Sequence, residues 1–245
     1  RSLTFIFLTT VHGQSKSSIT DSLDIVAPRL DNIEIKIDGY LDESVWNSAA
    51  SRSGFITYLP VDGRPADDDT EIRIWYSSTA LYVGIIAQEI HGEVRSTLAD
   101  RDKLDNEDYV LLVLDTYNDK RTAYTFAVNP IGQQSDGTLT DNSSIGRNSF
   151  PFKVDDNPDY VFTSSGRLTK DGFVVEVEIP LKSLRFQSKD TQNWGFNVLR
   201  RVQHSGYWSS WSGARQGVAS FLAQGGTLVD MSGLKREKVF DINPE

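Results

Sequence analysis

One stretch near the N-terminus decides how this chain is expected to fold: residues 37–49, with the sequence IDGYLDESVWNSA. An Asp-Gly pair is typical of a tight turn, so Asp38-Gly39 is expected to close a strand. Asp42 is then expected to cap a short helix whose inner face offers Trp46 to a core. The stretch therefore predicts a strand, a turn and one short helix in succession.

Beyond this stretch, apolar and polar residues alternate with a period of two, which is the pattern of strands. Between residues 173 and 179, Val175 and Val177 alternate with Glu176 and Glu178, which predicts a sheet with one face in water. Residues 81–87 and 109–114 are apolar at nearly every position and are expected to lie centrally. The predicted strands are residues 33–37, 71–77, 81–88, 109–114, 122–128, 161–164, 173–179, 194–202, 207–211 and 220–222.

Short strands joined by polar turns predict an all-β fold: a two-sheet antiparallel β-sandwich, jelly-roll-like, with the one short N-terminal helix. No linker rich in Pro, Gly or Ser divides the 245 residues, so a single domain is expected.

Several longer motifs follow the opening stretch in a fixed order: RDKLDNED at residues 101–108, TAYTFAVNPIG at 122–132, EVEIPLKSLRF at 176–186 and WGFNVLRR at 194–201. Together they resemble the carbohydrate-binding family 9-like domain, in particular the version that precedes an outer-membrane barrel region in many Gram-negative bacterial proteins. The resemblance spans roughly residues 33–234 and implies a secreted β-sandwich that binds sugar. It does not imply an active site.

The N-terminus has the pattern of a signal peptide. Arg1 precedes an apolar run at residues 3–11, which is too short to cross a bilayer and is followed by polar residues. We therefore expect a truncated signal peptide at residues 1–13, a flexible leader at 14–32, the sandwich at 33–234 and a connector at 235–245. The protein would be exported, to the periplasm or to the outer membrane or cell surface. The alternative for the N-terminus is a floppy apolar end or a first strand.

Composition excludes several classes of function. The net charge is −9 with the basic residues scattered, so the phosphate backbone of a nucleic acid would be repelled. The chain has no cysteine, which excludes disulfides, thiolate nucleophiles and cysteine-ligated zinc.

A sugar site needs an aromatic ring for the C–H face of the sugar and polar groups for its hydroxyls. Trp208 and Trp211 lie between glycines and serines, unusual company for core aromatics, so they are the best candidates for stacking. The alternative is that one of them is a core residue on a strand. Trp46 and Trp194 are expected in the core by their periodicity, and Trp75 is undecided.

The polar partners are expected near one rim of the sandwich. Arg200 and Arg201 must point to opposite faces of a strand, so we expect one to form a structural ion pair with Asp108 or Asp115 and the other to bind ligand. Asn129 serves either the ligand or the turn before Pro130. The predicted ligand-binding residues are Trp208, Trp211, Arg101, Asp102, Asp108, Asn129 and Arg201.

The loop at residues 101–108 carries four carboxylates, and the resembled family binds structural calcium. A hard cation takes several oxygen ligands, so Asp105 and Glu107 are candidate calcium ligands; the alternative is a solvated loop. The acidic run at residues 67–69 is expected to be a solvated turn.

No motif marks a catalytic pair of carboxylates, and His91 and His204 stand apart from any GxSxG motif. His91 is expected in a loop, whereas His204 lies near Trp208 in the sequence and could touch a ligand. The chain is therefore predicted to be a non-catalytic carbohydrate-binding module linked to carbohydrate catabolism. A docking domain of an outer-membrane barrel protein is the alternative, favoured by Phe162 where relatives carry a tryptophan; a hydrolase of O-glycosyl bonds comes third.

Overall fold

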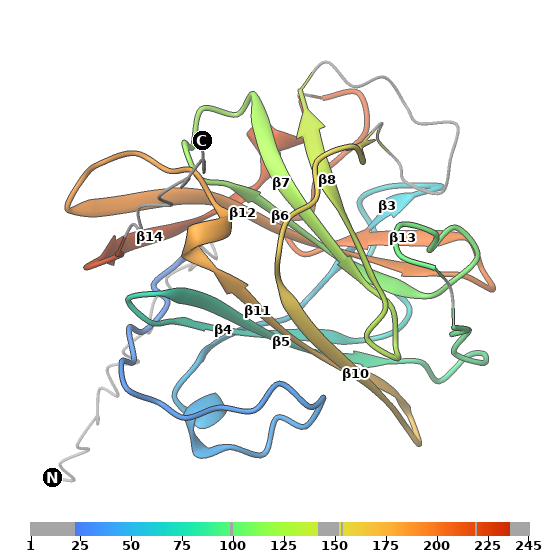
Figure 1. Cartoon of the computed structure of the whole chain (residues 1–245). Helices are drawn as coiled ribbons and strands as arrows, with labels where there is room; N and C mark the ends of the chain where they lie inside the picture. The colour runs from blue at the N-terminus through green and yellow to red at the C-terminus, as the bar shows by residue number, and fades with distance from the viewer. Residues whose placement is uncertain (1–22, 99, 142–151, 153, 219, 236–245) are drawn as a thin grey trace, which may run out of the picture.

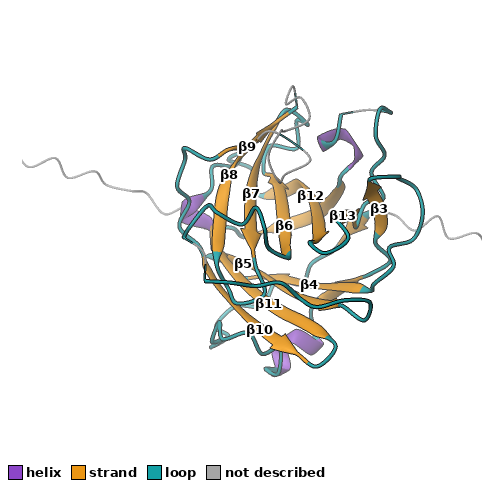
Figure 2. Ribbon diagram, turned by 90° about the vertical axis from the view of Figure 1, so that its right-hand side faces the viewer, coloured by secondary structure: helices purple, strands orange, loops and turns teal. Residues whose placement is uncertain are grey.

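Two β-sheets face each other across a shared apolar core (Figure 1). The structure is a computed structural model of the chain, and it describes residues 23–98, 100–141, 152, 154–218 and 220–235. The predicted signal segment lies outside these residues. Figure 2 shows the larger sheet curving over the smaller one.

The larger sheet has nine strands. Its order is β1 (Asp24–Ile25), β14 (Gly226–Ser232), β12 (Thr191–Val202), β6 (Tyr109–Asp115), β7 (Thr122–Val128), β8 (Gln134–Thr140) and β9 (Val154–Asp155), and β13 (Tyr207–Ser210) links β12 to β3 (Ile56–Leu59). The five-stranded sheet has the order β10 (Thr163–Thr169), β11 (Gly172–Pro180), β5 (Ala80–Gln88), β4 (Thr70–Tyr76) and β2 (Ala50–Arg52). All pairings are antiparallel except β1 with β14.

The predicted two-sheet sandwich is confirmed, and the segments expected to be central, β5 and β6, are buried along nearly their whole length. The sandwich begins earlier than predicted, because Ile25 in the expected leader is buried in β1. Residues 33–37 are not a strand. Residues 220–222 are not a strand either, since they lead into a 3₁₀ turn, η3 (Leu222–Gln224), which begins at Leu222.

The predicted N-terminal helix is a single 3₁₀ turn, η1 (Ser44–Asn47), and no side chain caps it. The other short turn is η2 (Leu181–Ser183). Among the described residues, no helix is long and apolar enough to cross a bilayer.

The segment around η1 covers the outer face of the smaller sheet, and Glu176 holds it there. The Glu176 carboxylate accepts hydrogen bonds from the backbone N–H groups of Asp38 (2.9 Å) and Gly39 (3.1 Å) and from the indole Nε1 of Trp46 (3.2 Å). Trp46 in turn packs edge-on against Trp75, which stacks on Tyr82. The prediction of a wet face at Glu176 is therefore wrong, because the opening sequence stretch covers it.

A second apolar cluster lies on the opposite, outer face of the larger sheet. Side chains of β6, β7 and β12 such as Leu111, Ala127 and Leu199 pack there beneath Phe152 and Phe221. Both sheets are thus covered on their outer as well as their inner faces.

Candidate functional site

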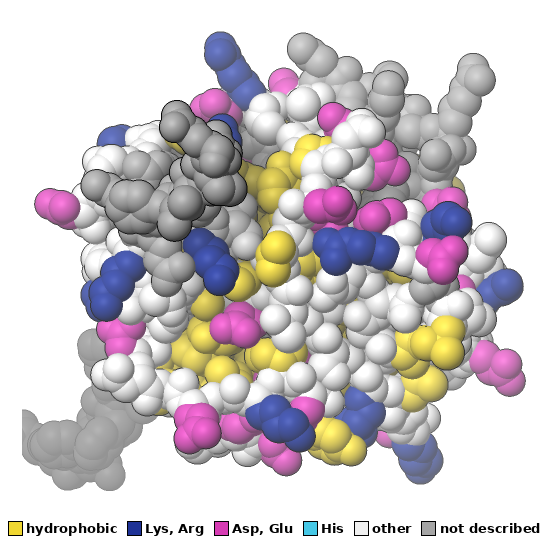
Figure 3. Space-filling view, viewed as in Figure 1, with side chains coloured by type: hydrophobic (Ala, Val, Ile, Leu, Met, Phe, Trp, Pro, Cys, Tyr) yellow, Lys and Arg dark blue, Asp and Glu magenta, His cyan; other side chains and the backbone are white. Residues whose placement is uncertain are grey.

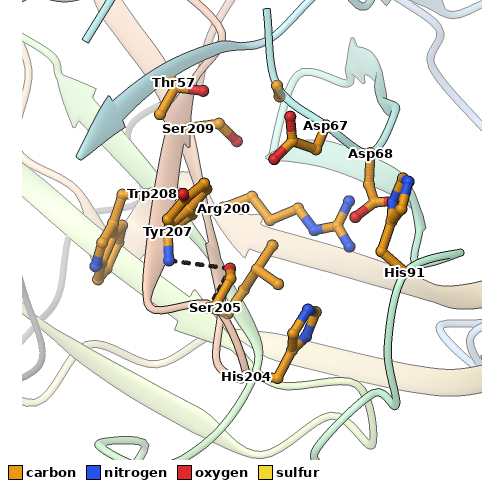
Figure 4. A pocket seen from close by; sticks show the side chains of 12 residues that line it. Thr57, Asp67, Asp68, His91, Arg200, His204, Ser205, Tyr207, Trp208 and Ser209 are labelled. Atoms are coloured by element: carbon orange, nitrogen blue, oxygen red, sulfur yellow. Dashed lines mark hydrogen bonds and ion pairs between the residues drawn. The ribbon is translucent and has the colours of Figure 1, made fainter. Parts of the chain in front are cut away.

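A pocket of about 280 Å³ opens at one end of the sandwich, where β12 turns into β13 and the loops after β3 and β5 approach it (Figure 4). We call it the end cleft. Its walls come from four separate stretches of the chain, and the residues that line it are Thr57, Ala66, Asp67, Asp68, His91, Arg200, Val202, His204, Ser205, Tyr207, Trp208 and Ser209.

One wall is an acid–imidazole pair from two loops. Asp68 is almost fully buried, and its Oδ1 lies 2.8 Å from Nδ1 of the exposed His91 ring. The same oxygen accepts the backbone N–H of Ile90 at 3.1 Å. The hydrogen bond and the charge of Asp68 raise the pKa of His91. The prediction that residues 67–69 form a wholly solvated turn is wrong for Asp68.

The floor of the cleft is the buried guanidinium of Arg200, which extends toward Asp68 (Figure 4). It donates to the hydroxyl of Thr70 at 3.2 Å and lies 3.5 Å from the carboxylate of Glu89. Burial lowers the pKa of Arg200, and burial raises the pKa of Glu89. The arginine expected to form a structural ion pair is therefore Arg200, and its partner is Glu89 rather than Asp108 or Asp115.

The opposite wall is the inner face of β13. Tyr207 and Ser209 point to this face because side chains alternate along a strand, and Tyr207 is half-buried with the guanidinium of Arg64 5.2 Å from its ring centre. His204 lines the base of the wall beside Gly92. A Cβ atom at position 92 would lie 2.7 Å from the imidazole of His204, so glycine leaves room for this ring.

Asp108 fixes the loops that shape the cleft. Its carboxylate is fully buried and accepts the backbone N–H groups of Arg95 (2.6 Å) and Gln203 (3.1 Å). The loop after β5 and the turn after β12 are thus tied to the start of β6. The cleft therefore presents an aromatic ring, two imidazoles, hydroxyls and carboxylates on loops that are fixed by hydrogen bonds. This set of groups suits a ligand with many hydroxyl groups.

Comparison with known families identifies the chain. The family model described as "Carbohydrate family 9 binding domain-like" matches residues 37–218, which is most of the sandwich and includes every wall of the cleft. The chain belongs to this family. Its sequence has no match among curated proteins.

Solved structures with a similar fold include proteins from Caldicellulosiruptor kristjanssonii and Bacteroides uniformis ATCC 8492. Family 9 carbohydrate-binding modules from Caldicellulosiruptor kristjanssonii, in complex with cellotriose and with glucose, both have a TM-score of 0.57, at 15% and 17% identity. Each match covers 90% of this chain, and 98% and 100% of those chains. A protein from Bacteroides uniformis ATCC 8492 has a TM-score of 0.60 at 15% identity, covering 84% of this chain and 98% of its own. At such identities the likeness shows a shared fold.

The two tryptophans predicted to stack on sugar are not exposed in this family 9-like domain. Trp208 is 4% and Trp211 is 6% exposed. Trp208 packs edge-on against Tyr109 at 5.3 Å, under the guanidinium of Arg201, on the outer face of the larger sheet. Trp211 lies in the main core, 6.1 Å from Phe196. The predicted open rim of indole rings is therefore wrong, although Trp208 borders the end cleft.

The small residues around these tryptophans serve packing. Gly226 accommodates the Trp211 ring, since a Cβ atom there would lie 2.5 Å from Cζ3 of the indole. Ser210 and Ser212 accept hydrogen bonds from the side-chain amide of Asn197, at 3.0 and 2.8 Å. The Trp-Ser-Ser-Trp-Ser pattern thus reflects a close fit between strands.

The other predicted ligand residues divide between loop anchors and a separate cluster. Asn129 is fully buried, caps its own turn by accepting the backbone N–H groups of Ile131 and Gln133, and donates to the carbonyl of Thr97. Arg101 and Asp102 both contact Asp136 of β8: Arg101 through an ion pair of 2.5 Å, and Asp102 by accepting its backbone N–H. Neither residue lines the end cleft.

The candidate calcium ligands do not form a common site. Both oxygens of Glu107 accept hydrogen bonds from Thr97, from its backbone N–H and its hydroxyl, each at 2.6 Å. Asp105 is exposed at the surface. Within the described part of the chain, no group of three or more His, Cys, Asp or Glu side chains is arranged to hold a metal ion.

The residues that sequence reasoning missed are Asp68 and Tyr207, which line the cleft, and Glu89, which is buried beneath it and pairs with Arg200. His204, expected from its place in the sequence to be able to touch a ligand, lines the cleft. The signal for Tyr207 was present, because alternation from the core residue Trp211 places Ser209 and Tyr207 on the inner face near the strand end. Asp68 and Glu89 gave no such signal, since the loops that bring them together are far apart in sequence.

Proposed function

We propose that this chain is a carbohydrate-binding module and that the end cleft holds the sugar. The observation that carries the proposal is the cleft itself, a 280 Å³ hollow at the loop end of a family 9-like domain with an aromatic ring and charged hydrogen-bonding groups on facing walls. The cellotriose and glucose in the complexes of the Caldicellulosiruptor kristjanssonii modules support a neutral saccharide as the ligand class.

The proposed binding mode assigns a role to each wall. The C–H face of a pyranose ring rests on Tyr207, whose other side is held by Arg64. The exposed imidazole of His91 and the hydroxyl of Ser209 bond to sugar hydroxyls, and Asp67 accepts from them. Arg200 and Glu89 satisfy each other's charges below and set the shape of the floor.

Titration of the protein by calorimetry tests this proposal, with glucose, cellotriose and a panel of other neutral mono- and trisaccharides as ligands. We expect Tyr207→Ala to lower the affinity of the cleft for sugar at least tenfold, since the substitution removes the stacking surface. Tyr40→Ala is the matched control, because Tyr40, like Tyr207, lies under an arginine, in this case Arg167, but is outside the cleft. Equal affinities of the two variants would refute the cleft as the site.

A docking scaffold is the second candidate. The burial of both Trp208 and Trp211 and of Phe162 favours it, because those rings act as core residues here. In this alternative, the exported domain keeps the sandwich and contacts another region of its own protein, such as an outer-membrane barrel. Docking would be supported if the wild-type protein bound no sugar of the panel and associated tightly with another region of its own protein. A role in carbohydrate catabolism would follow only from sugar binding.

A further inference from the structure

A second pocket, of about 350 Å³, lies at the other end of β6 from the end cleft. The loop after β6, the start of β7, the end of β8 and the segment before β10 form its walls. We call it the tyrosine pocket, because Tyr117, Tyr124 and Tyr160 line it. Figure 3 shows apolar side chains reaching the surface over β7 and β8, among scattered charges. Asp108, which ties down the loops of the end cleft, and Thr116, which lines the tyrosine pocket, are eight residue steps apart along β6, a span of roughly 25 Å.

Two rings of this pocket, those of Tyr124 and Tyr160, are held in place. Tyr124 and Tyr160 lie 4.8 Å apart at 75°, so they form two walls that meet nearly at right angles. The hydroxyl of Tyr160 is hydrogen-bonded to that of Thr138 at 2.9 Å, and the hydroxyl of Tyr124 accepts the backbone N–H of Arg185 at 2.8 Å. Tyr117 is 45% exposed at the mouth. A ligand would therefore meet ordered aromatic surfaces and lose little affinity to side-chain ordering.

The chemistry of the lining differs from that of the end cleft. It combines the three phenol rings with threonine hydroxyls, including those of Thr122 and Thr138, and with one carboxylate, the exposed Asp119. The residues that line it include no lysine, arginine or histidine. Such a surface offers C–H contact and hydroxyl hydrogen bonds with no cationic side chain in its lining, so it favours a neutral, hydroxylated ring over an anion.

We infer that the tyrosine pocket is a second saccharide-binding site, which takes a neutral pyranose between Tyr117 and the Tyr124–Tyr160 corner. The pyranose hydroxyls bond to Thr122, Thr138 and Asp119. This inference extends the proposed function to a second site on a separate part of the molecule. A domain with two such sites at opposite ends of a strand would hold a polysaccharide more tightly than a short sugar, by effective concentration.

Heteronuclear NMR titration with cellotriose, followed on the backbone amides of the full chain, tests the inference, together with the other neutral trisaccharides of the panel. We expect two groups of shifted resonances, one around Tyr207 and one around Tyr117. Tyr117→Ala should lower the sugar affinity reported by the second group at least tenfold and leave the affinity reported by the first group unchanged. Tyr207→Ala should have the opposite effect. Tyr117 is exposed, so its removal is not expected to unfold the protein. Thr138→Val, which keeps side-chain volume, provides a second probe of the same pocket.

Each result separates the two sites. Loss of all shifts in Tyr207→Ala, with none lost in Tyr117→Ala, would overturn the second site and leave the end cleft standing. Loss of all shifts in Tyr117→Ala, with none lost in Tyr207→Ala, would support the tyrosine pocket and refute the end cleft as a sugar site. Shifts at Tyr117 with tetramethylammonium but with none of the sugars would also overturn the inference, because an aromatic pocket with a carboxylate can instead take a cation. Binding of glucuronate as tight as that of glucose would contradict a neutral ligand.

Discussion

The outer face of the smaller sheet and the end cleft both contain a buried carboxylate, and the two are used in different ways. Glu176 accepts three hydrogen bonds from the segment that carries the most diagnostic motif, and the result is a closed structural joint. Glu89 pairs with Arg200 beneath a hollow that reaches the surface. The opening motif of the family thus holds the fold together, whereas the end cleft proposed to bind ligand is lined mostly by residues outside the diagnostic motifs, such as His91 in a loop and Tyr207 on β13.

The largest effect on stability is expected from a substitution that breaks the structural joint between Glu176 and the segment around η1. Trp46→Ala removes a fully buried ring and one donor to Glu176, so the free energy of unfolding should fall by about 3–5 kcal/mol. Sugar affinity of the folded protein should not change. Chemical denaturation measures the loss, and Tyr40→Ala, an exposed ring on the same segment, should cost less than about 1 kcal/mol. A loss no larger than that of the control would show that the joint contributes little.

The next largest effect is expected at the floor of the cleft. Arg200→Met leaves Glu89 buried without its partner, and the free energy of unfolding should fall by about 3 kcal/mol. The double variant Arg200→Met/Glu89→Met should recover most of this loss. Arg64→Met breaks the exposed pair with Asp67 and should cost about 0–1 kcal/mol. A double variant as unstable as the single one would show that the loss comes from packing rather than from an unpaired charge.

The joint also predicts a pH dependence of stability. Burial raises the pKa of Glu176 from 4.5 to about 7, so the folded state binds a proton that the unfolded state releases in this range. The contribution of Glu176 to the free energy of unfolding is therefore largest below about pH 4.5 and declines as pH rises to about 7, by no more than about 3 kcal/mol. Glu176→Gln should flatten this part of the curve. Identical slopes in the two proteins would contradict the assignment.

The smallest effect is an expected change of sugar affinity with pH, caused by the Asp68–His91 pair in the wall of the cleft. The hydrogen bond to Asp68 raises the pKa of His91 above its usual value, so the ring stays charged to higher pH and its Nε2–H remains available as a donor. Sugar affinity should fall by a few-fold as pH rises through this pKa. His91→Gln keeps a donor without titrating, and its affinity should be independent of pH over the same range. A wild-type affinity with no such decline would remove His91 from the site.

The sequence predicted the fold better than the site. The strands at residues 109–114 and 122–128 were found because apolar runs and alternation identify buried strands. The strand β8 was missed because its sequence, QSDGTLT, resembles a turn, yet its pairing with β7 keeps it in the sheet. Residues 33–37 alternate like a strand but pack as an extended loop onto Trp46 and Trp75.

The tryptophan site was predicted wrongly for a physical reason. Small neighbours suggested exposure for Trp208 and Trp211, whereas here Gly226 and the serines make space for close packing. The geometry of the loops decides which polar groups come into contact. The contact between Asp68 and His91 therefore cannot be predicted from a local sequence pattern. Candidate sites built from strand motifs alone therefore found the residues that anchor the loops, Asp108 and Asn129, rather than those that line the cleft.

A crystal structure of the protein with the sugar that binds most tightly in titration tests the central claim most directly. The account predicts a pyranose in the end cleft, stacked on Tyr207 and hydrogen-bonded to His91. Sugar found over the outer face of the larger sheet beside Trp208, with the end cleft empty, would contradict it.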